Sequence, residues 1–228
     1  AAQCYLGFCY ANGNGVSKDN AEALKWYRKA ADQEYHLAQC FLGDCYANGN
    51  GISKDNAEAV KWYTKAAEQG YKLAQSFLGD CYANGNGISK DEAEAVSWYR
   101  KSADQGYVHA QFSLSVCYLN GKGVHKDAEE SVRWCRKAAE QGLAIAQNNL
   151  GISYANGSGI TKDQSEAVKW FRKAANQGAD NSQFMLGNCY WNGDGVSKDL
   201  AEALKWYRKA ADQGFAEAQK YMGILYAD

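Results

Sequence analysis

The sequence predicts an all-α solenoid of 36-residue helix-turn-helix repeats, and three observations lead to this fold class. Tryptophan recurs with a fixed period at Trp26, Trp62, Trp98, Trp134, Trp170 and Trp206. Pairs of turn glycines keep the same period, at Gly13/Gly15, Gly49/Gly51, Gly85/Gly87, Gly121/Gly123, Gly157/Gly159 and Gly193/Gly195. The chain contains no proline, so nothing interrupts a helix. A period in the mid-thirties is typical of stacked helix pairs, each of which buries its apolar face only against its neighbours.

The repeats occupy the whole chain. None of the copies carries an insertion, and six copies are followed by the start of a seventh. We therefore expect residues 1–228 to form a single solenoid domain of six repeats plus the first helix of a seventh. Because the sequence opens within a repeat, we also expect it to be a fragment of a longer protein.

The first helix of each unit can be followed in the second copy. Leu42, Cys45 and Tyr46 lie three and four residues apart, which places them on one apolar stripe. Gly43 within this helix costs about 1 kcal/mol relative to alanine. Its recurrence in nearly every copy predicts that a neighbouring helix approaches closely at this point. Gly49 is expected to end the helix in a left-handed conformation.

The second helix of the unit begins after an acidic residue. Asp55 and Glu58 have the spacing of a capping box, and the pair recurs in every copy. Alanines and rings such as Trp62 follow at helical spacing and predict an inward-facing surface. Gly70 ends the unit. The first copy has Glu34 at that position, which predicts a local conflict if the site needs a positive φ.

The charge balance argues against several partner classes. The chain carries 25 basic and 26 acidic residues and has a formal net charge of −1. Such a balance does not favour nucleic acid or an anionic membrane surface. No apolar run approaches the roughly 18 residues of a spanning helix, so we expect no membrane insertion in this segment. The recurring basic residues of the second helix, such as Lys25, Arg28 and Lys29, are expected to form a solvated face.

The eight cysteines are predicted to be free thiols, mostly buried as small apolar side chains. Five of them share one repeat position, two share another, and Cys135 stands alone. Stacking separates equivalent positions by roughly 10 Å, which is too far for a disulfide or a shared metal. Free thiols favour a reducing compartment.

The repeat unit resembles that of a known family. The string Leu-Gly-x-x-Tyr-x-x-Gly-x-Gly, followed by Asp, Ala, Trp-Tyr, Lys-Ala-Ala and Gln-Gly at fixed spacing, is complete or nearly so in all six copies. It resembles the Sel1-like repeat, a branch of the tetratricopeptide-type helical solenoids. The resemblance implies a right-handed superhelical stack that acts as a non-catalytic scaffold or adaptor for a peptide or protein partner. It also implies a family whose members are often exported or in the secretory pathway.

Two alternative functions stay open at this stage. A cysteine-rich bacterial branch of the family carries disulfides within its repeats and includes β-lactam-binding members, which makes a hydrolase or β-lactam-binding enzyme one alternative. The cysteines here lack a regular partner on the second helix, and this departs from that branch. The other alternative is a structural spacer or an array that associates end to end, since the helices expected at 5–10 and 219–226 lack an outer neighbour.

Candidate binding residues come from comparing the copies with one another. Positions that vary on the first helix, such as those of Phe41 and Asp44, share one helical face and are free to contact a partner. This face is expected to line the concave groove, where asparagine amides suit an extended peptide backbone. The alternative interpretation is that the rings pack between helices and the polar residues are merely solvated. The candidates are Phe41, Asp44, Phe77, Asp80, His109, Phe112, Asn148, Asn149, Asn181, Phe184 and Asn188.

A catalytic or metal site is not predicted. His109, Ser113 and Cys117 are spaced four apart on one helix, but no nearby acid is placed to orient the histidine. Cys117 also occupies a position that four other cysteines fill. Asp44 and Asp80 are separated by about a helix diameter, too far to act as a pair of carboxylates. We therefore expect no catalytic residues, no metal ligands and no cofactor.

Overall fold

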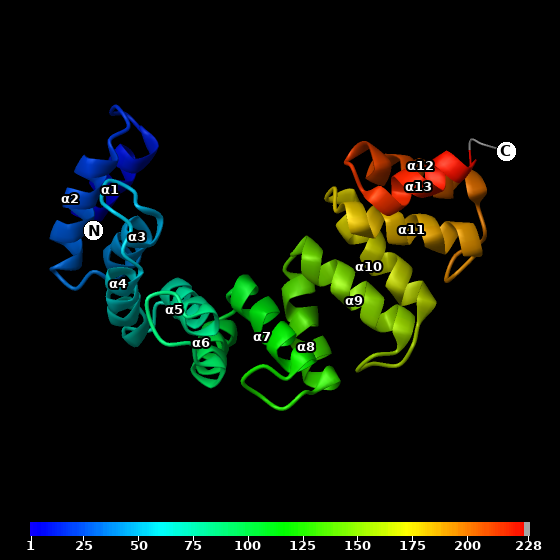
Figure 1. The fold of residues 1–228 in the computed structure, drawn as a ribbon, viewed down its shortest axis with the longest axis horizontal. Coiled ribbons are helices and arrows are strands. Elements are labelled where there is room, and N and C mark those ends of the chain that lie inside the picture. The colour runs from blue at the N-terminus through cyan, green and yellow to red at the C-terminus, as the bar shows by residue number, and fades with distance from the viewer. Residues whose placement is uncertain (226–228) are drawn as a thin grey trace. The chain divides into compact units, whose positions relative to one another are not determined.

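A computed structural model describes residues 1–225 of the chain, which form thirteen α-helices and no strand (Figure 1). The helices of the first four repeats are α1 (Ala2–Asn12), α2 (Asn20–Ala31), α3 (His36–Asn48), α4 (Asn56–Glu68), α5 (Lys72–Asn84), α6 (Glu92–Asp104), α7 (Val108–Asn120) and α8 (Ala128–Glu140). The later helices are α9 (Ala144–Asn156), α10 (Gln164–Asn176), α11 (Asp180–Asn192), α12 (Leu200–Asp212) and α13 (Ala216–Leu225). The predicted all-α repeat architecture is confirmed.

The chain divides into two compact units. One comprises Ala1–Cys117 with Gly121–His125, and the other comprises Tyr118–Asn120 with Lys126–Asp228. Within each unit, the two helices of a repeat pack on each other, and the second helix packs on the first helix of the next repeat. Among the described residues, none of the helices is both long and apolar enough to cross a membrane. Of the terminal helix expected at 219–226, Tyr226 lies outside the described residues.

The turn between the two helices of a repeat is built on glycine, as predicted. Gly49 follows α3 with φ 76° and donates its backbone N–H to the Cys45 carbonyl oxygen at 2.9 Å. The N–H of Asn50 reaches the same carbonyl at 2.9 Å. The left-handed conformation thus satisfies a helix-terminal carbonyl, which is the physical role of a C-terminal glycine.

The start of the second helix confirms one half of the predicted capping box and corrects the other. The Asp55 carboxylate accepts the backbone N–H groups of Ala57 and Glu58, both at 3.0 Å. Glu58 does not reach back to the capping residue, because it pairs with Lys61 at 2.5 Å. The N–H of Asp55 donates instead to the Tyr46 carbonyl at 2.9 Å. The start of α4 is therefore tied directly to the end of α3.

The mid-helix glycines allow the close approach that their repetition predicted. A Cβ atom added at Gly43 would lie 2.6 Å from the Tyr63 ring of the same repeat. Equivalent glycines of the first, third, fifth and sixth repeats face a Tyr or Phe ring in the same way. The fourth repeat has Ser115 at the glycine position and Cys135 at the ring position, so both members of the contact change together.

The conflict predicted at Glu34 is also confirmed. Glu34 has φ 60° and is the one residue other than glycine with a positive φ between residues 1 and 225. Its counterpart Gly70 has φ 85°. A left-handed conformation costs a residue with a Cβ atom about 1–2 kcal/mol. The first repeat therefore contains a strained inter-repeat turn that the other repeats avoid.

Lys25, Arg28 and Lys29 are exposed, as predicted, and they also make specific contacts with neighbouring side chains. The Lys29 ammonium lies over the Trp26 ring at 4.4 Å from its centroid, and every repeat has this Lys–Trp pair. Lys25 pairs with Glu22 at 2.5 Å, and Arg28 donates to the Tyr46 hydroxyl of the next repeat. The helical spacing of three places each lysine above the ring that precedes it.

A ladder of glutamines joins successive repeats. Gln39 is buried and donates its side-chain amide to the Ala31 carbonyl of the preceding repeat at 3.4 Å. Its own amide oxygen accepts the side-chain amide of Gln69 at 2.7 Å. The same pairing recurs at Gln75/Gln105, Gln147/Gln177 and Gln183/Gln213. Because a buried amide needs partners for both its donor and its acceptor, this ladder fixes the register between neighbouring repeats.

Candidate functional site

The N-terminal unit carries three equivalent pockets, one at each of its first three repeat boundaries. Each is lined by the end of a first helix, the turn that follows, the start of the second helix, and the first helix of the next repeat. Their volumes are about 240, 270 and 370 Å³ in chain order. We call them the first, second and third boundary pockets.

The first two boundary pockets have the same lining, residue for residue. Their members are Ala11, Asn12, Lys18, Asn20, Ala23, Tyr27, Phe41, Asp44, Cys45 and Asn50 in the first, and Ala47, Asn48, Lys54, Asn56, Ala59, Tyr63, Phe77, Asp80, Cys81 and Asn86 in the second. The pockets thus unite four of the predicted binding residues, Phe41, Asp44, Phe77 and Asp80, with a polar rim. Each combines two aromatic rings, one carboxylate and several amides.

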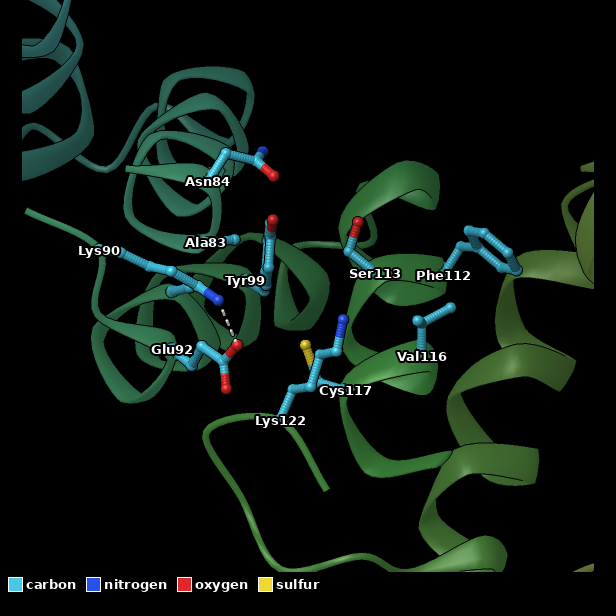
Figure 2. A pocket seen from close by; sticks show the side chains of 11 residues that line it. Ala83, Asn84, Lys90, Glu92, Tyr99, Phe112, Ser113, Val116, Cys117 and Lys122 are labelled. Atoms are coloured by element: carbon cyan, nitrogen blue, oxygen red, sulfur yellow. Dashed lines mark ion pairs between the residues drawn. The ribbon is translucent and has the colours of Figure 1, made fainter. Parts of the chain in front are cut away.

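The third boundary pocket departs from this pattern. Val116 and Ser113 stand where the second pocket has Asp80 and Phe77, and Lys122 replaces an asparagine. Figure 2 shows Lys90 and Glu92 on one side of the pocket, paired at 2.8 Å, with Ser113 across from them. The third pocket is therefore larger and lacks a carboxylate at the position of Asp80.

The carboxylates of the first two pockets are held by tyrosines of their own repeats. The Tyr63 hydroxyl donates to Asp44 Oδ1 at 2.7 Å, and the Tyr99 hydroxyl donates to Asp80 Oδ1 at 2.7 Å. Burial raises the pKa of both carboxyl groups, and the tyrosine hydrogen bond opposes that shift. A positive charge on His109 would further oppose the pKa shift of Asp80. In both cases desolvation of the charged form is the larger effect.

We predict that Asp44→Asn raises the melting temperature at pH 7 by a few degrees. A raised folded-state pKa means that the folded chain binds the proton more tightly than the unfolded chain. The contribution of Asp44 to stability is therefore greatest in acid and is lost as pH rises through the folded-state pKa. The amide keeps the acceptor oxygen but carries no charge to desolvate. Thermal unfolding of both proteins between pH 3 and pH 8 should show the difference at pH 7 and its decrease in acid.

Tyr63→Phe is the matched control for this prediction. It removes the hydroxyl that favours the Asp44 carboxylate, so stability at pH 7 should fall and the pKa of Asp44 should rise further. A neutral-pH loss of stability in Asp44→Asn would contradict the prediction, because it would mean that the charge stabilises the fold.

The predicted asparagines of the second unit make internal contacts. Asn148 is 7% exposed, and its side-chain oxygen accepts the Ser182 hydroxyl at 2.8 Å. Asn188 is half-buried and accepts the Tyr207 hydroxyl at 2.7 Å, which repeats the Asp44–Tyr63 arrangement with an amide. Asn149 is half-buried and Asn181 is exposed. Of the four asparagines, Asn181 is therefore the most accessible to a partner.

The predicted aromatic residues differ in accessibility. Phe184 is 8% exposed and packs against the rings of Tyr207, Phe215 and Tyr221, with centroids 5.3–5.6 Å away. This matches the alternative interpretation, in which the rings pack between helices. Phe112 is half-buried and lines the third boundary pocket.

The histidine and thiol positions do not assemble a nucleophile. His109 is exposed, its ring lies 5.5 Å from that of Tyr107, and within residues 1–225 it makes no hydrogen bond to Ser113 or Cys117. Burial raises the pKa of the Cys117 thiol to about 11, so it is protonated at neutral pH. Burial likewise raises the pKa of Cys45, Cys81 and Cys189 to about 11. No group of three potential metal ligands occurs in the described part of the chain.

Sequence analysis did not single out the rim of the boundary pockets. Lys18, Asn12 and Asn50 are not among the candidate binding residues predicted from the sequence. Lys18 and Asn12 are the same in every copy, so comparing the copies does not mark them. The positions of Asn20 and Asn50 do vary, since Asn56 is replaced by Glu92 and Asn86 by Lys122 one repeat later. These substitutions leave the turn glycines unchanged, so the turn itself does not require an asparagine there.

Solved structures with the same fold come from several bacteria. The protective antigen c5321 of uropathogenic Escherichia coli, described as an SLR fold, is 36% identical over 99% of this chain with a TM-score of 0.86. A Sel1 repeat protein from Oxalobacter formigenes is 36% identical over 98% of the chain with a TM-score of 0.87. A Sel1 repeat protein from Klebsiella pneumoniae subsp. pneumoniae shares the fold at 20% identity and a TM-score of 0.54, covering 89% of this chain and 99% of its own.

The chain is shorter than its two more similar relatives, since it spans 56% of the E. coli protein and 64% of the O. formigenes protein. No curated protein matches the sequence. The family model of the Sel1 repeat matches six consecutive segments, residues 1–35, 36–71, 72–107, 108–143, 144–178 and 180–215. These segments coincide with the helix pairs described above, and the chain therefore belongs to the Sel1 repeat family.

Proposed function

We propose that this chain is a non-catalytic scaffold that holds an extended segment of a protein partner along its boundary pockets. The observation that carries the proposal is the repetition of one pocket frame with a changing lining. Tyr, Lys and Ala positions recur at each boundary, whereas the residues at the base and rim differ in the third pocket. Two matching subsites followed by a third, different one suit a peptide that runs across several repeats.

The family supports the general class of this function. Sel1 repeat proteins generally mediate protein–protein interactions, and the family is generally non-enzymatic. The rival function, a hydrolase or β-lactam-binding enzyme, would need an activated nucleophile. The protonated Cys117 thiol and the absence of a hydrogen bond from His109 to Ser113 or Cys117 in the described residues speak against that rival here.

The pocket rim supplies the test of the scaffold function. Asn50 and Asn86 are exposed and line the first and second pockets, so their truncation removes amides without opening the core. We predict that the double substitution Asn50→Ala and Asn86→Ala raises the Kd for the partner about tenfold, which corresponds to the loss of one or two hydrogen bonds. The partner is identified by cross-linking in the native host and then purified for calorimetric titration.

The first repeat supplies the control for this experiment. Asn14 occupies the same turn position as Asn50, is exposed, and lines none of the three boundary pockets. Asn14→Ala should leave the partner affinity unchanged. If the partner binds the double variant as tightly as it binds the unmodified chain, the boundary pockets are not its docking site.

A further inference from the structure

We propose that the first two boundary pockets each bind a basic side chain, and that together they select an extended peptide with two arginines three residues apart. This inference rests on the proposed scaffold function and specifies the chemistry of the partner. It depends on the Asp44 and Asp80 carboxylates, on the rings beside them, and on the contrast with the third pocket.

Each carboxylate can accept more hydrogen bonds than the described part of the fold supplies. Asp44 and Asp80 accept one tyrosine hydroxyl apiece through Oδ1, and no other hydrogen bond or ion pair reaches either side chain within residues 1–225. A partly buried charge without an ion-pair partner is unfavourable for folding, and within residues 1–225 His109 influences Asp80 without forming an ion pair with it. A cation entering the pocket would supply the missing partner through Oδ2.

The tyrosine contact itself does not require a negative charge. In the sixth repeat, the Tyr207 hydroxyl donates to the neutral amide oxygen of Asn188 at 2.7 Å, the same distance as in the Asp pairs. An asparagine in place of Asp44 or Asp80 would therefore still accept the tyrosine hydrogen bond. The charge is an addition beyond what the repeat needs, and it occurs at the two positions that line the first and second pockets.

The walls of these pockets also suit a cation. The rings of Tyr27 and Phe41 lie 5.2 Å apart in the first pocket, and those of Tyr63 and Phe77 lie 5.3 Å apart in the second. Tyr27 and Tyr63 are buried, so the half-buried rings of Phe41 and Phe77 are the accessible members of each pair, and the faces of such rings attract guanidinium groups.

The rim asparagines add hydrogen-bond acceptors. Asn12 donates its amide N–H to the Phe8 carbonyl at 2.9 Å, and its counterpart in the second pocket, Asn48, donates to the Asp44 carbonyl at 3.0 Å. The side-chain oxygens of both asparagines accept no hydrogen bond within residues 1–225 and can accept guanidinium N–H groups. Lys18 and Lys54 also line the pockets, but both are exposed and neither forms an ion pair with the described residues. Their charges lie at the solvent side, where salt screens them.

The third boundary pocket has the same position in its repeat but no unpaired carboxylate. Val116 occupies the position of Asp80, and Glu92 is already paired with Lys90 at 2.8 Å (Figure 2). Lys122 adds a positive charge at the rim. A basic side chain would therefore find no unpaired carboxylate there, which limits the proposed cation sites to two consecutive boundaries.

The spacing of the two sites sets the spacing of the arginines. The interaxial distance of packed helices, about 8–10 Å, gives an expected step of roughly 10 Å between equivalent positions of neighbouring repeats. A polyproline II peptide advances about 3.1 Å per residue and has three residues per turn. Side chains three residues apart therefore lie on one face of such a peptide, about one repeat step apart. The expected recognition element is Arg-x-x-Arg.

Fluorescence anisotropy with a short, capped, fluorescein-labelled Arg-x-x-Arg peptide tests the inference. We expect saturable binding to the full chain, at least tenfold weaker binding when citrulline replaces both arginines, and a similar loss in Asp44→Asn with Asp80→Asn. Citrulline keeps the shape and removes the charge. Asp104→Asn with Asp212→Asn is the matched control, because it removes two exposed carboxylates outside the pockets and should leave binding unchanged. Thermal melts confirm that each variant is folded.

The outcomes separate this inference from the scaffold function. Equal binding of the arginine and citrulline peptides, no detectable binding of either, or equal weakening by the control variant would each overturn the inference. If the native partner is lost with Asn50→Ala and Asn86→Ala but is unaffected by Asp44→Asn and Asp80→Asn, the scaffold function stands and the cation sites do not. If neither pair of substitutions affects the native partner, both proposals fail.

Discussion

Gly87→Ala is expected to destabilise the N-terminal unit by about 3 kcal/mol or more. A Cβ atom at this turn position would lie 2.1 Å from the Asn56 carbonyl oxygen and 2.3 Å from its carbon, both in the preceding repeat. These are backbone atoms at the start of α4, so relief requires a shift of the whole helix end. Overpacking of this kind costs about 1–3 kcal/mol, and the φ of +75° adds about 1–2 kcal/mol for any residue with a Cβ atom.

Gly15→Ala separates the two contributions. Gly15 has φ +73° and no atom within 4 Å of an added Cβ, so the substitution introduces the conformational cost alone. We expect a loss of about 1–2 kcal/mol, measured by urea unfolding at constant temperature. Equal losses for the two variants would show that the stack does not depend on the close approach at Gly87.

The architecture was predictable because every copy repeats the same local requirements. Five of the six complete repeats have a glycine at the position of Gly43, and in each of the five an aromatic ring lies against it, Tyr63 in the case of Gly43. The Asp55 cap was predictable because it involves only the next three residues. The error in the capping box arose because Glu58 had two partners within reach, and the sequence does not rank Lys61 against a backbone N–H.

Contacts across the two helices of a repeat were harder to predict. The pairs Asp44/Tyr63, Asp80/Tyr99 and Asn188/Tyr207 are each 19 residues apart. At the same two positions the fourth repeat has Val116 and Cys135, and the fifth has Ile152 and Phe171. Where the second helix has a tyrosine, the first helix thus has a polar acceptor. Where the second helix has no hydroxyl at that position, the first helix has an aliphatic residue. Only the first repeat, with Phe8 and Tyr27, departs from this rule.

Burial of polar residues was the main gap in the candidate site. Asn148 looked like a surface residue because it varies between copies, yet it is buried with Ser182 from the next repeat as its partner. That partner lies 34 residues away, and a single sequence does not reveal which polar pairs satisfy each other inside the stack. Variation between copies therefore indicates both binding positions and compensated internal contacts.

Trp170→Ala should destabilise the C-terminal unit by about 3–5 kcal/mol, as expected for truncation of a large buried ring. Trp170 is 7% exposed, whereas its counterpart Trp98 in the other unit is half-buried, so the same change at Trp98 should cost less. Each ring is covered by a lysine, with the ammonium of Lys173 at 3.8 Å and that of Lys101 at 3.7 Å from the ring centroid. The difference between the two sites therefore reports ring burial and not the cation contact.

Two conservative variants identify what the Trp170 ring contributes. Its indole N–H is buried without a hydrogen-bond partner among residues 1–225, so Trp170→Phe removes an unsatisfied donor while keeping an aromatic ring. We expect Trp170→Phe to recover most of the stability lost in Trp170→Ala. Lys173→Met keeps the alkyl stem and removes the charge above the ring, which should cost at most about 1 kcal/mol. Urea unfolding followed by circular dichroism measures all of these variants. A loss below 1 kcal/mol for Trp170→Ala, or a Lys173→Met loss of equal size, would mean that burial of this ring does not hold the repeat together.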